Sequence, residues 1–151
     1  MSLQSDIAVL RSVTLFDDLD DDALRLLAFG ADHRRFPAGD TIFRESAIAD
    51  AGFVVADGTV TLSTGSPDKP KIVGAYGPGT LLGEMALITD TRRPATARAE
   101  TQCDLLRIGR AHFRRLLEEY PNFAAGLEAR LRDRFIQMTR QLAAMQDRFV
   151  D

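Results

Sequence analysis

The chain has 151 residues, of which 45% are hydrophobic, so it is long enough to fold as a single domain (residues 1–151) around its own core. Its net charge of -3 does not supply the broad positive field that binding to a nucleic-acid backbone usually needs. The single cysteine, Cys103, excludes an internal disulfide, and no apolar run is long enough to span a bilayer. We therefore expect a soluble cytoplasmic protein with no membrane partner.

Residues 5–30 are expected to form helices. Ile7, Leu10 and Val13 are spaced by threes, and the apolar pattern of A-L-R-L-L-A-F ends at Gly30, as is typical of a helix that stops on a glycine. Residues 17–22 are mostly aspartate. These carboxylates could bind a metal ion, but acidic residues also cap the positive end of a helix, and we expect the capping role.

Residues 32–108 are expected to form short β-strands, because short apolar runs alternate with turn sequences such as P-A-G-D, G-S-P-D-K-P and G-P-G-T. The pair Asp57-Gly58, between V-V-A and T-V-T-L, predicts a β-hairpin. Strands of this length and spacing are typical of a jelly roll or barrel, which leaves few strand edges exposed.

One segment, G-E-M-A-L-I at 83–88, interrupts the strand pattern and is long enough for one helical turn. The first N–H groups of a helix have no partner inside it, so they attract anions. Gly83 allows a ligand to approach the backbone closely. The apolar residues Met85, Leu87 and Ile88 are expected to anchor the turn to the barrel.

Two charged residues flank this turn. Arg93 carries a forked set of permanently charged donors that suits phosphate oxygens. Glu84 only accepts hydrogen bonds when it is ionised and would repel a phosphate, so we expect it to bind neutral donors such as sugar hydroxyls. A nucleotide whose phosphate lies close to its ribose satisfies both residues. The alternative is a surface ion pair between Glu84 and Arg93, worth less than about 1 kcal/mol.

The helical period returns in residues 110–149, with a first helix that stops at Pro121. The apolar positions of the second helix step by four and three: Leu131, Phe135, Met138, Leu142, Met145 and Phe149. So narrow a stripe indicates a partner helix, and we expect a homodimer through helix 122–149, the alternative being that the stripe packs on its own barrel. The predicted fold class is α+β: an antiparallel β jelly roll flanked by N-terminal helices and a long C-terminal helix.

The sequence L-G-E-M-A-L-I-T-D-T-R-R-P-A-T-A resembles the phosphate-binding cassette of cyclic nucleotide-binding domains. The usual form of that cassette is F-G-E, an apolar residue, A-L, a variable stretch, and then R followed by two small residues. P-A-G-D-T-I-F-R-E, F-V-V-A-D-G-T-V-T-L, Y-G-P-G-T and C-D-L-L-R-I-G-R-A-H-F-R-R-L-L also fall where the family has similar phrases, so the resemblance extends over about 13–149. It implies the β-roll of the catabolite activator and of protein kinase A regulatory subunits.

The resemblance also implies roles for individual residues. Glu84 would accept a hydrogen bond from the ribose 2'-hydroxyl, and Gly83 would line the sugar. Ala86 would give its N–H to the cyclic phosphate, whose charge Arg93 would hold. The remaining implied ligand contacts are the apolar cassette position Met85, the base-facing Val73, and Thr139, which falls near a hydroxyl that the long helix of the catabolite activator group offers to adenine.

Three residues depart from the family pattern. Leu82 replaces the usual phenylalanine, and Gly74 stands where activator-type members can offer a hydroxyl to the base. The small pair after the arginine is Pro94-Ala95 here. In the family the residue after the arginine can donate its N–H to the phosphate, and proline has none. We expect the lost bond to cost about 1.5–3 kcal/mol of binding.

These observations favour a regulatory module that binds cAMP or cGMP and signals through its C-terminal helix. We expect cAMP rather than cGMP, because cGMP-selective cassettes tend to carry a threonine where this chain has Pro94. No catalytic motif is found, and His33 and His112 are too few to build the metal centre of a cupin-type enzyme. No helix-turn-helix follows helix 122–149, so direct DNA binding is not expected. The alternative function is a homologous domain that binds no nucleotide and serves as a dimerisation or docking scaffold.

Overall fold

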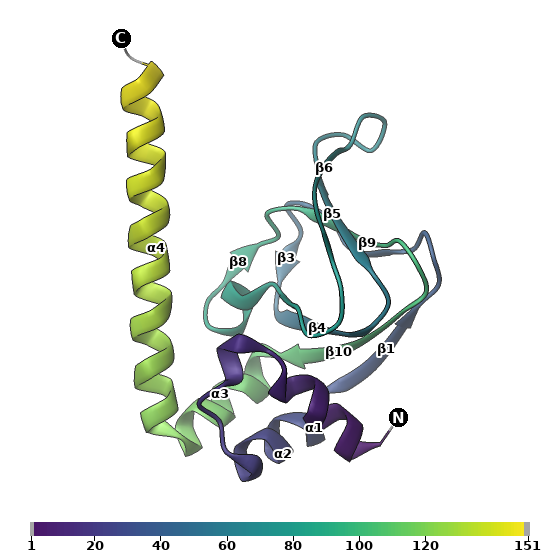
Figure 1. The fold of residues 1–151 in the computed structure, drawn as a ribbon, viewed down its shortest axis with the longest axis vertical. Helices are drawn as coiled ribbons and strands as arrows, with labels where there is room; N and C mark the ends of the chain where they lie inside the picture. Colours follow the sequence, from purple (N-terminus) through teal and green to yellow (C-terminus); the bar gives the residue numbers. More distant parts are fainter. Residues whose placement is uncertain (1, 150–151) are drawn as a thin grey trace. The chain divides into compact units, whose positions relative to one another are not determined.

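The computed structural model describes the backbone of residues 2–149, and their side chains except at positions 135, 138, 139 and 141–149. The chain divides into two compact units, Met1–Leu116 and Leu117–Asp151. The first unit holds the N-terminal helices and the strands, and the second contains helix α4 (Pro121–Phe149) (Figure 1). Helix α3 (Arg110–Glu119) begins in the first unit and ends in the second.

The N-terminal segment is helical, as predicted. It forms α1 (Leu3–Arg11), the short 3-10 helix η1 (Thr14–Phe16) and α2 (Asp21–Phe29). The Asp20 side chain accepts a hydrogen bond from the Ala23 N–H at 2.9 Å, and Gly30 is the C-cap of α2. The capping role expected within the aspartate run is therefore confirmed for Asp20.

The first unit is built on antiparallel strands, most of them short. In chain order they are β1 (Asp32–Phe36), β2 (Thr41–Phe43), β3 (Ile48–Ala49), β4 (Ala51–Asp57), β5 (Val60–Thr64), β6 (Lys71–Tyr76), β7 (Leu81–Leu82), β8 (Thr91–Arg92), β9 (Thr96–Ala99) and β10 (Cys103–Gly109). Among the described residues they form sheets of order β1-β10-β4-β7 and β2-β9-β5-β6, with a small β3-β8 pair. The α+β class and the antiparallel β-roll are confirmed.

The predicted hairpin at Asp57-Gly58 is wrong. Strand β4 pairs with β10 and β7, whereas β5 pairs with β6 and β9, so this turn carries the chain from one sheet to the other. Gly58 does adopt the positive φ of 91° that the dipeptide signals. Local sequence specifies that turn, but strand pairing depends on burial, and β4 is buried from Ala51 to Val55 because both its faces are covered.

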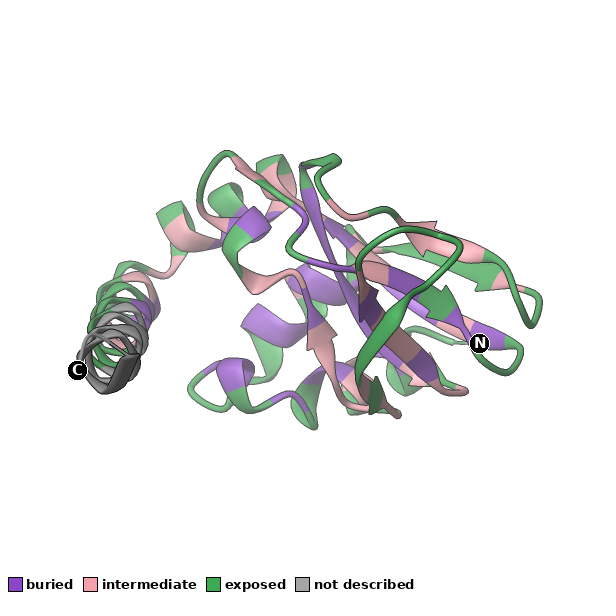
Figure 2. Cartoon of the chain, turned by 90° about the horizontal axis from the view of Figure 1, so that it is seen from above, coloured by how far each residue is buried: buried purple, intermediate pink, exposed green. Residues whose placement is uncertain are grey.

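Strand β4 separates two layers of the core. On one face, Phe53 and Val55 join a cluster inside the roll that includes Leu82, Ala97 and Leu105. On the other face, Val54 and Leu106 are fully buried, since successive side chains of a strand alternate between faces. Figure 1 shows α1 and α2 near β10 and β1, and Figure 2 shows the buried residues (purple) concentrated in the central strands and the helix faces beside them.

Cys103 begins β10 and is fully buried, as expected of a small strand residue. Its thiol donates to the carbonyl oxygens of Thr59 and Thr101 at 3.2 and 3.3 Å. Burial raises the pKa of the thiol, because the charged thiolate is poorly solvated there.

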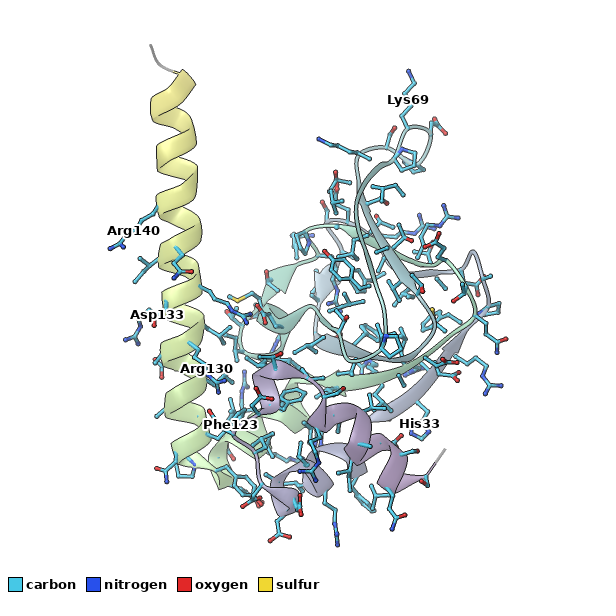
Figure 3. All side chains as sticks on the ribbon, in the orientation of Figure 1. His33, Lys69, Phe123, Arg130, Asp133 and Arg140 are labelled. Atoms are coloured by element: carbon cyan, nitrogen blue, oxygen red, sulfur yellow. The ribbon has the colours of Figure 1, made fainter. Side chains whose placement is uncertain are left out.

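The long C-terminal helix is present over Pro121–Phe149, as predicted. Asp133 and Arg140 project from it as exposed side chains (Figure 3). The heptad residues Phe135, Met138, Leu142, Met145 and Phe149 have side chains that lie outside the described residues, so the dimer stays a prediction. In the described part of the chain, no helix is both long enough and apolar enough to cross a bilayer.

Two glycines with nearly the same φ differ in the space around them. Substituting each by alanine therefore distinguishes the destabilisation caused by a positive φ from that caused by a steric clash. Gly39 and Gly58 have φ values of 92° and 91°, but a Cβ on Gly39 would meet no described atom within 4 Å, whereas one on Gly58 would clash with the backbone oxygen of Gln102. We expect Gly39→Ala to lose about 1–2 kcal/mol of unfolding free energy and Gly58→Ala about 1–3 kcal/mol more. Urea denaturation measures both, and equal losses would contradict the clash.

Candidate functional site

The segment 83–88 forms a short helical turn whose position is fixed by the buried residues on its inner side. Strand β7 leads through Gly83, with φ 79° and ψ 41°, into the 3-10 helix η2 (Glu84–Leu87), and this turn is here called the cassette turn. Leu82, Ala86 and Leu87 are buried and anchor it. Met85 was expected to help but is 42% exposed, so that expectation is wrong. Met85 occupies the solvent side of a turn whose buried side is filled by Ala86 and Leu87.

Backbone contacts of the cassette turn connect it to the start of α3. The Ala86 N–H donates to the Gly83 carbonyl at 3.1 Å, so a phosphate that binds this N–H must share it or replace that bond. The Ala86 carbonyl accepts from Arg110 Nε at 2.8 Å, and Arg110 Nη1 donates to Asp90 at 2.6 Å. Arg110 Nη2 also donates to the carbonyl of Ala49. The side chain of Arg110 thus connects the cassette turn to Asp90, which follows it, and to the Ala49 carbonyl.

Arg93 lies inside the protein, not on its surface. Its N–H donates to the Ala47 carbonyl and its own carbonyl accepts from the Ser46 N–H, both at 2.8 Å. Its side chain is 5% exposed, and Nη2 donates to the Ala51 carbonyl at 2.8 Å. The alternative of a surface ion pair between Glu84 and Arg93 is therefore wrong, because a buried arginine cannot form one.

The guanidinium of Arg93 is held by aromatic rings and leaves one nitrogen without a partner. Its central carbon lies 4.3 Å from the centre of the Phe43 ring and 5.6 Å from that of Phe53, within range of a cation–π interaction. Within the described residues, the buried Nη1 has no hydrogen-bond partner. A Cβ built on Gly83 would clash with this atom, so Nη1 lies directly against the first residue of the cassette turn.

Burial also sets the electrostatics of Arg93. Desolvation lowers its pKa, the Asp50 carboxylate acts in the opposite direction, and Arg107 lowers the pKa further. An arginine nevertheless stays protonated at neutral pH. A buried donor left unpaired costs about 1–3 kcal/mol, which an anion placed beside it would recover. The site is therefore a buried positive charge behind the cassette turn, with one donor that has no partner among the described residues.

The other predicted site residues differ in how far they are exposed. Glu84 begins η2 and is partly exposed. Ala95 is 6% exposed, whereas Pro94 is exposed and offers no N–H. Val73 is 50% exposed and has no partner across the sheet, because a bulge shifts the register so that Leu62 faces Gly74 and Ser63 faces Ile72. The side chain of Thr139 lies outside the described residues.

Sequence reasoning missed three aromatic residues at this site. Phe43 and Phe53 contact each other and both lie within cation–π range of the arginine, and Tyr76 packs against the same internal cluster. A Cβ on Gly74 would lie 2.5 Å from the Tyr76 hydroxyl, so a hydroxyl is present beside the position where the sequence lacked one. The alternation of each strand indicates which of its residues face inward, but it does not indicate which inward residues meet across sheets.

The two histidines make contacts within the fold. Nε2 of His33 lies 2.6 Å from Oδ2 of the buried Asp6, and Nε2 of His112 lies 3.1 Å from the Leu27 carbonyl near the end of α2. Across residues 2–149, no described group of three or more His, Cys, Asp or Glu side chains could hold a metal ion.

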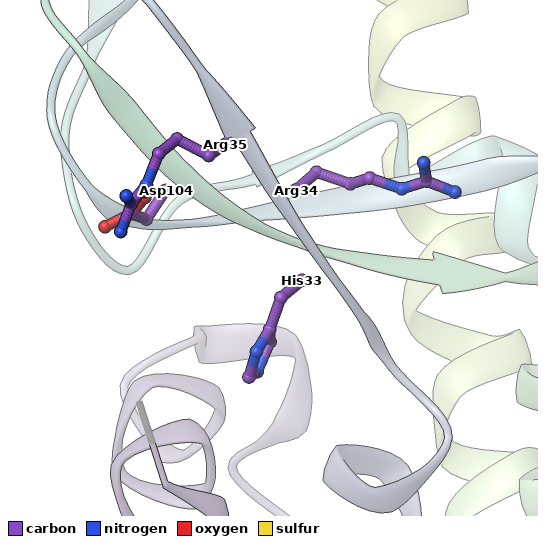
Figure 4. Close-up of a pocket in the computed structure, with 4 residues that line it drawn as sticks. All are labelled: His33, Arg34, Arg35 and Asp104. Carbon is purple, nitrogen blue, oxygen red and sulfur yellow. Dashed lines mark hydrogen bonds and ion pairs between the residues drawn. The ribbon is translucent and has the colours of Figure 1, made fainter.

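A cavity of about 380 Å³ at the edge strand β1 is separate from the cassette turn (Figure 4). It is lined by His33, Arg34, Arg35 and Asp104. Arg35 pairs with Asp104 at 3.0 Å, and His33 contacts Asp6, while Arg34 points away from the others. Because Arg35 and His33 are each paired with a carboxylate and Arg34 points away from them, this cavity offers no converging set of unpaired charges among the described residues.

The packing of Arg93 against Gly83 is testable without a ligand. Gly83→Ala should displace the guanidinium and lower the unfolding free energy by about 1–3 kcal/mol more than Gly39→Ala, which has a similar positive φ but open space. The displacement should also move the NMR signal of the Arg93 Nε–H. Equal stability losses with an unmoved Arg93 signal would show that the two residues do not touch.

Comparison with known proteins agrees with this geometry. The family model described as cyclic nucleotide-binding domain matches residues 33–120. A cyclic nucleotide-gated potassium channel of Rhizobium etli is 35% identical over 116 residues, and the match covers 77% of this chain but 31% of the channel. The chain thus spans about a third of that relative's length.

Solved structures show the same architecture. A cyclic nucleotide-binding-like protein from Brucella abortus is 42% identical, with a TM-score of 0.69 over 75% of this chain and 97% of that one. The regulatory domain of Toxoplasma gondii PKA, solved with cAMP, is 26% identical, with a TM-score of 0.70 over 76% of this chain and 44% of that one. With its cassette turn and its buried arginine, the chain belongs to the cyclic nucleotide-binding domain family.

Proposed function

We propose that the protein is a regulatory sensor that binds a cyclic mononucleotide, with cAMP as the preferred ligand. The observation that carries this proposal is the buried guanidinium of Arg93, whose Nη1 has no described partner and lies against Gly83. A cyclic phosphate at the cassette turn would supply the missing acceptor and the missing negative charge. In the described part of the chain, no protein group accepts a hydrogen bond from this nitrogen.

The rest of the cassette turn supports a nucleotide rather than a bare anion. The phosphate would contact Arg93 Nη1 and N–H groups of the turn, including that of Ala86. Glu84, partly exposed at the start of η2, would accept from the ribose 2'-hydroxyl. Gly83, Leu82 and Ala95 would form the close apolar wall around the sugar and phosphate.

Apolar and hydroxyl groups around the turn would contact the base. Val73 and Met85 are each about half exposed and offer apolar surface. The Tyr76 hydroxyl, beside Gly74, would take the place of the hydroxyl that activator-type relatives carry on this strand. Thr139 would approach adenine from α4. We prefer cAMP because Pro94 has no hydroxyl to offer to a guanine, and because the Toxoplasma gondii relative was solved with cAMP.

Pro94 sets the expected strength of binding. Its missing N–H removes one donor to the phosphate, which corresponds to roughly tenfold to a hundredfold in affinity relative to a cassette with a donor there. The neighbouring Arg92 does not replace it, since Arg92 is exposed and its Nη1 donates to the Ser46 carbonyl at 2.9 Å. The proposed site therefore binds, but more weakly than a cassette with the full set of donors.

The proposed output is the C-terminal helix. A ligand changes an equilibrium between two conformations only through a difference in its affinity for them, so contacts that α4 makes with the bound base would favour one position of that helix. The same helix would pair with its copy in a homodimer through its heptad stripe. In this role the protein is regulatory and performs no catalysis itself.

Isothermal titration calorimetry with cAMP tests the proposal. We expect saturable heat, a rise in unfolding free energy of about 2.7 kcal/mol at a hundredfold excess over the dissociation constant, and weaker binding of cGMP. Arg93→Gln should weaken cAMP binding by about a hundredfold, because it removes charge-assisted bonds to the phosphate.

Arg92→Gln is the matched control, because it removes the same charge from an exposed neighbour. It should change the affinity by less than about threefold, since exposed charges contribute little. If cAMP, cGMP and cyclic dinucleotides all give neither heat nor a thermal shift, the sensor proposal fails and the non-binding scaffold replaces it.

The proposed dimer is tested separately by light scattering after size exclusion. Met138→Glu and Leu142→Glu should convert a dimer to a monomer, because each places an unpaired charge in the heptad seam. Arg140→Glu, on an exposed position of the same helix, should leave the mass unchanged. A mass that responds to neither seam substitution would show that the stripe is not an interface.

A further inference from the structure

A second polar cavity lies on the outer face of the β2-β9-β5-β6 sheet. Along β9, Ala97 and Ala99 face the internal cluster, so Thr96 and Arg98 face outward. Ser63 lies opposite Thr96 on β5, and Thr41 lies opposite Arg98 on β2. These residues line a cavity of about 180 Å³, here called the outer cavity, together with Arg44 and the loop of residues 65–70.

Two guanidinium groups give the outer cavity its positive charge. Arg98 donates from Nη2 to the Gly39 carbonyl at 3.2 Å, which leaves its remaining N–H groups for other acceptors. The Arg44 carbonyl accepts from the Ala47 N–H at 3.2 Å, but its side chain, which lines the cavity, has no hydrogen bond or ion pair among the described residues. The forked donor geometry of arginine matches phosphate oxygens, and two such groups suit a doubly charged anion.

Hydroxyl groups complete a set of donors on the cavity floor. The Thr96 hydroxyl oxygen accepts from the Glu45 N–H at 2.9 Å, so its hydrogen is left to donate elsewhere. Ser63 is 8% exposed, and its hydroxyl has no described protein partner. The Glu45 carboxylate reaches the rim, where Oε1 accepts from the Gly65 N–H at 3.3 Å. Two arginines and one carboxylate leave a net positive charge.

The loop that walls the outer cavity is restrained. Pro67 and Pro70 both line it, and each fixes its own φ. The Lys69 N–H donates to the Ser66 carbonyl at 3.1 Å, which closes a turn over Pro67 and Asp68, and the Lys69 side chain projects from this loop (Figure 3). A wall that is ordered before the ligand arrives loses little entropy on binding.

We propose that the outer cavity is a second anion site that binds a phosphate group, either free or as the end of a small phosphate monoester. Its volume corresponds to about six water molecules at about 30 Å³ each, which is room for a phosphate and a few further atoms. It is distinct from the site of Arg93, because that residue faces the interior of the roll and Arg98 faces the opposite surface. Arg98 lies within β9 and Arg93 lies three residues before this strand, but the two sites have no side chain in common.

An NMR titration of the whole chain with inorganic phosphate, with chloride used to hold the ionic strength constant, tests this proposal. Saturable shifts should appear at the amides of Gly65, Thr96 and Arg98. Arg98→Gln and Arg44→Gln should each weaken binding about tenfold or more, because each removes charged donors. Ser63→Ala, which removes a hydroxyl and no charge, should weaken it by a smaller factor.

Arg34→Gln is the matched control, because it removes the same charge from an exposed arginine on a different sheet. It should leave the phosphate-induced shifts at Gly65, Thr96 and Arg98 unchanged. Absence of saturable shifts overturns the proposal. Shifts confined to Gly83, Ala86 and their neighbours, which disappear in Arg93→Gln and persist in Arg98→Gln, also overturn it, since they would place the phosphate at the cassette turn alone. Failure of the nucleotide proposal is read independently from the cAMP titration.

Discussion

The structure depends on one charged group that is buried where charge is costly. The guanidinium of Arg93 is nearly enclosed, lies over the ring of Phe43 and donates one bond to the Ala51 carbonyl. These contacts offset part of its desolvation, yet one nitrogen stays unpaired within the described residues. That arrangement requires a glycine at position 83, because any side chain there would occupy the space of the guanidinium. It also requires the cassette turn to stay in place, which the burial of Ala86 and Leu87 ensures.

The sequence allowed the chemistry of this site to be predicted better than its surroundings. Gly83 and Arg93 could be placed side by side in a proposed anion site because backbone access and a forked cation are properties of residue type, and the structure does bring the two residues into contact. Phe43 and Phe53 could not be assigned to it, because alternation along a strand gives the face of each residue but not its neighbour in the opposite sheet. The prediction for Met85 was wrong for a related reason. A short turn buries only one side, and its sequence does not show which apolar residues lie on that side.

The same distinction between local and distant effects applies to the fold. The helices of 5–30 and 110–149 and the strands of 32–108 follow from the period of their apolar residues, which is a local property. The error at Asp57-Gly58 arose because the dipeptide specifies a tight turn but not the partners of the strands it joins. Gly58 turns as its sequence indicates, and the chain then enters a different sheet because β4 is already paired on both edges, with β10 and β7.

Strand β9 and the residues just before it carry arginines that face opposite sides of the sheet. Arg93, just before the strand, faces inward, and Arg98, within it, faces outward; Thr96 between them accepts from the Glu45 backbone. A sheet of this kind keeps two cations close along the chain while separating them by a layer of packed apolar side chains, so that their charges act on different regions of solvent.

Arg110 determines how a movement of the cassette turn would propagate. Its side chain donates to the carbonyl of Ala86 and to Asp90, while its own N–H donates to the Asp50 carbonyl at the start of α3. A turn that shifts by more than the length of a hydrogen bond must therefore either rupture these bonds or drag the first residues of α3 with it. Any displacement of the turn would thus reach the N-terminal end of α3 through this one side chain.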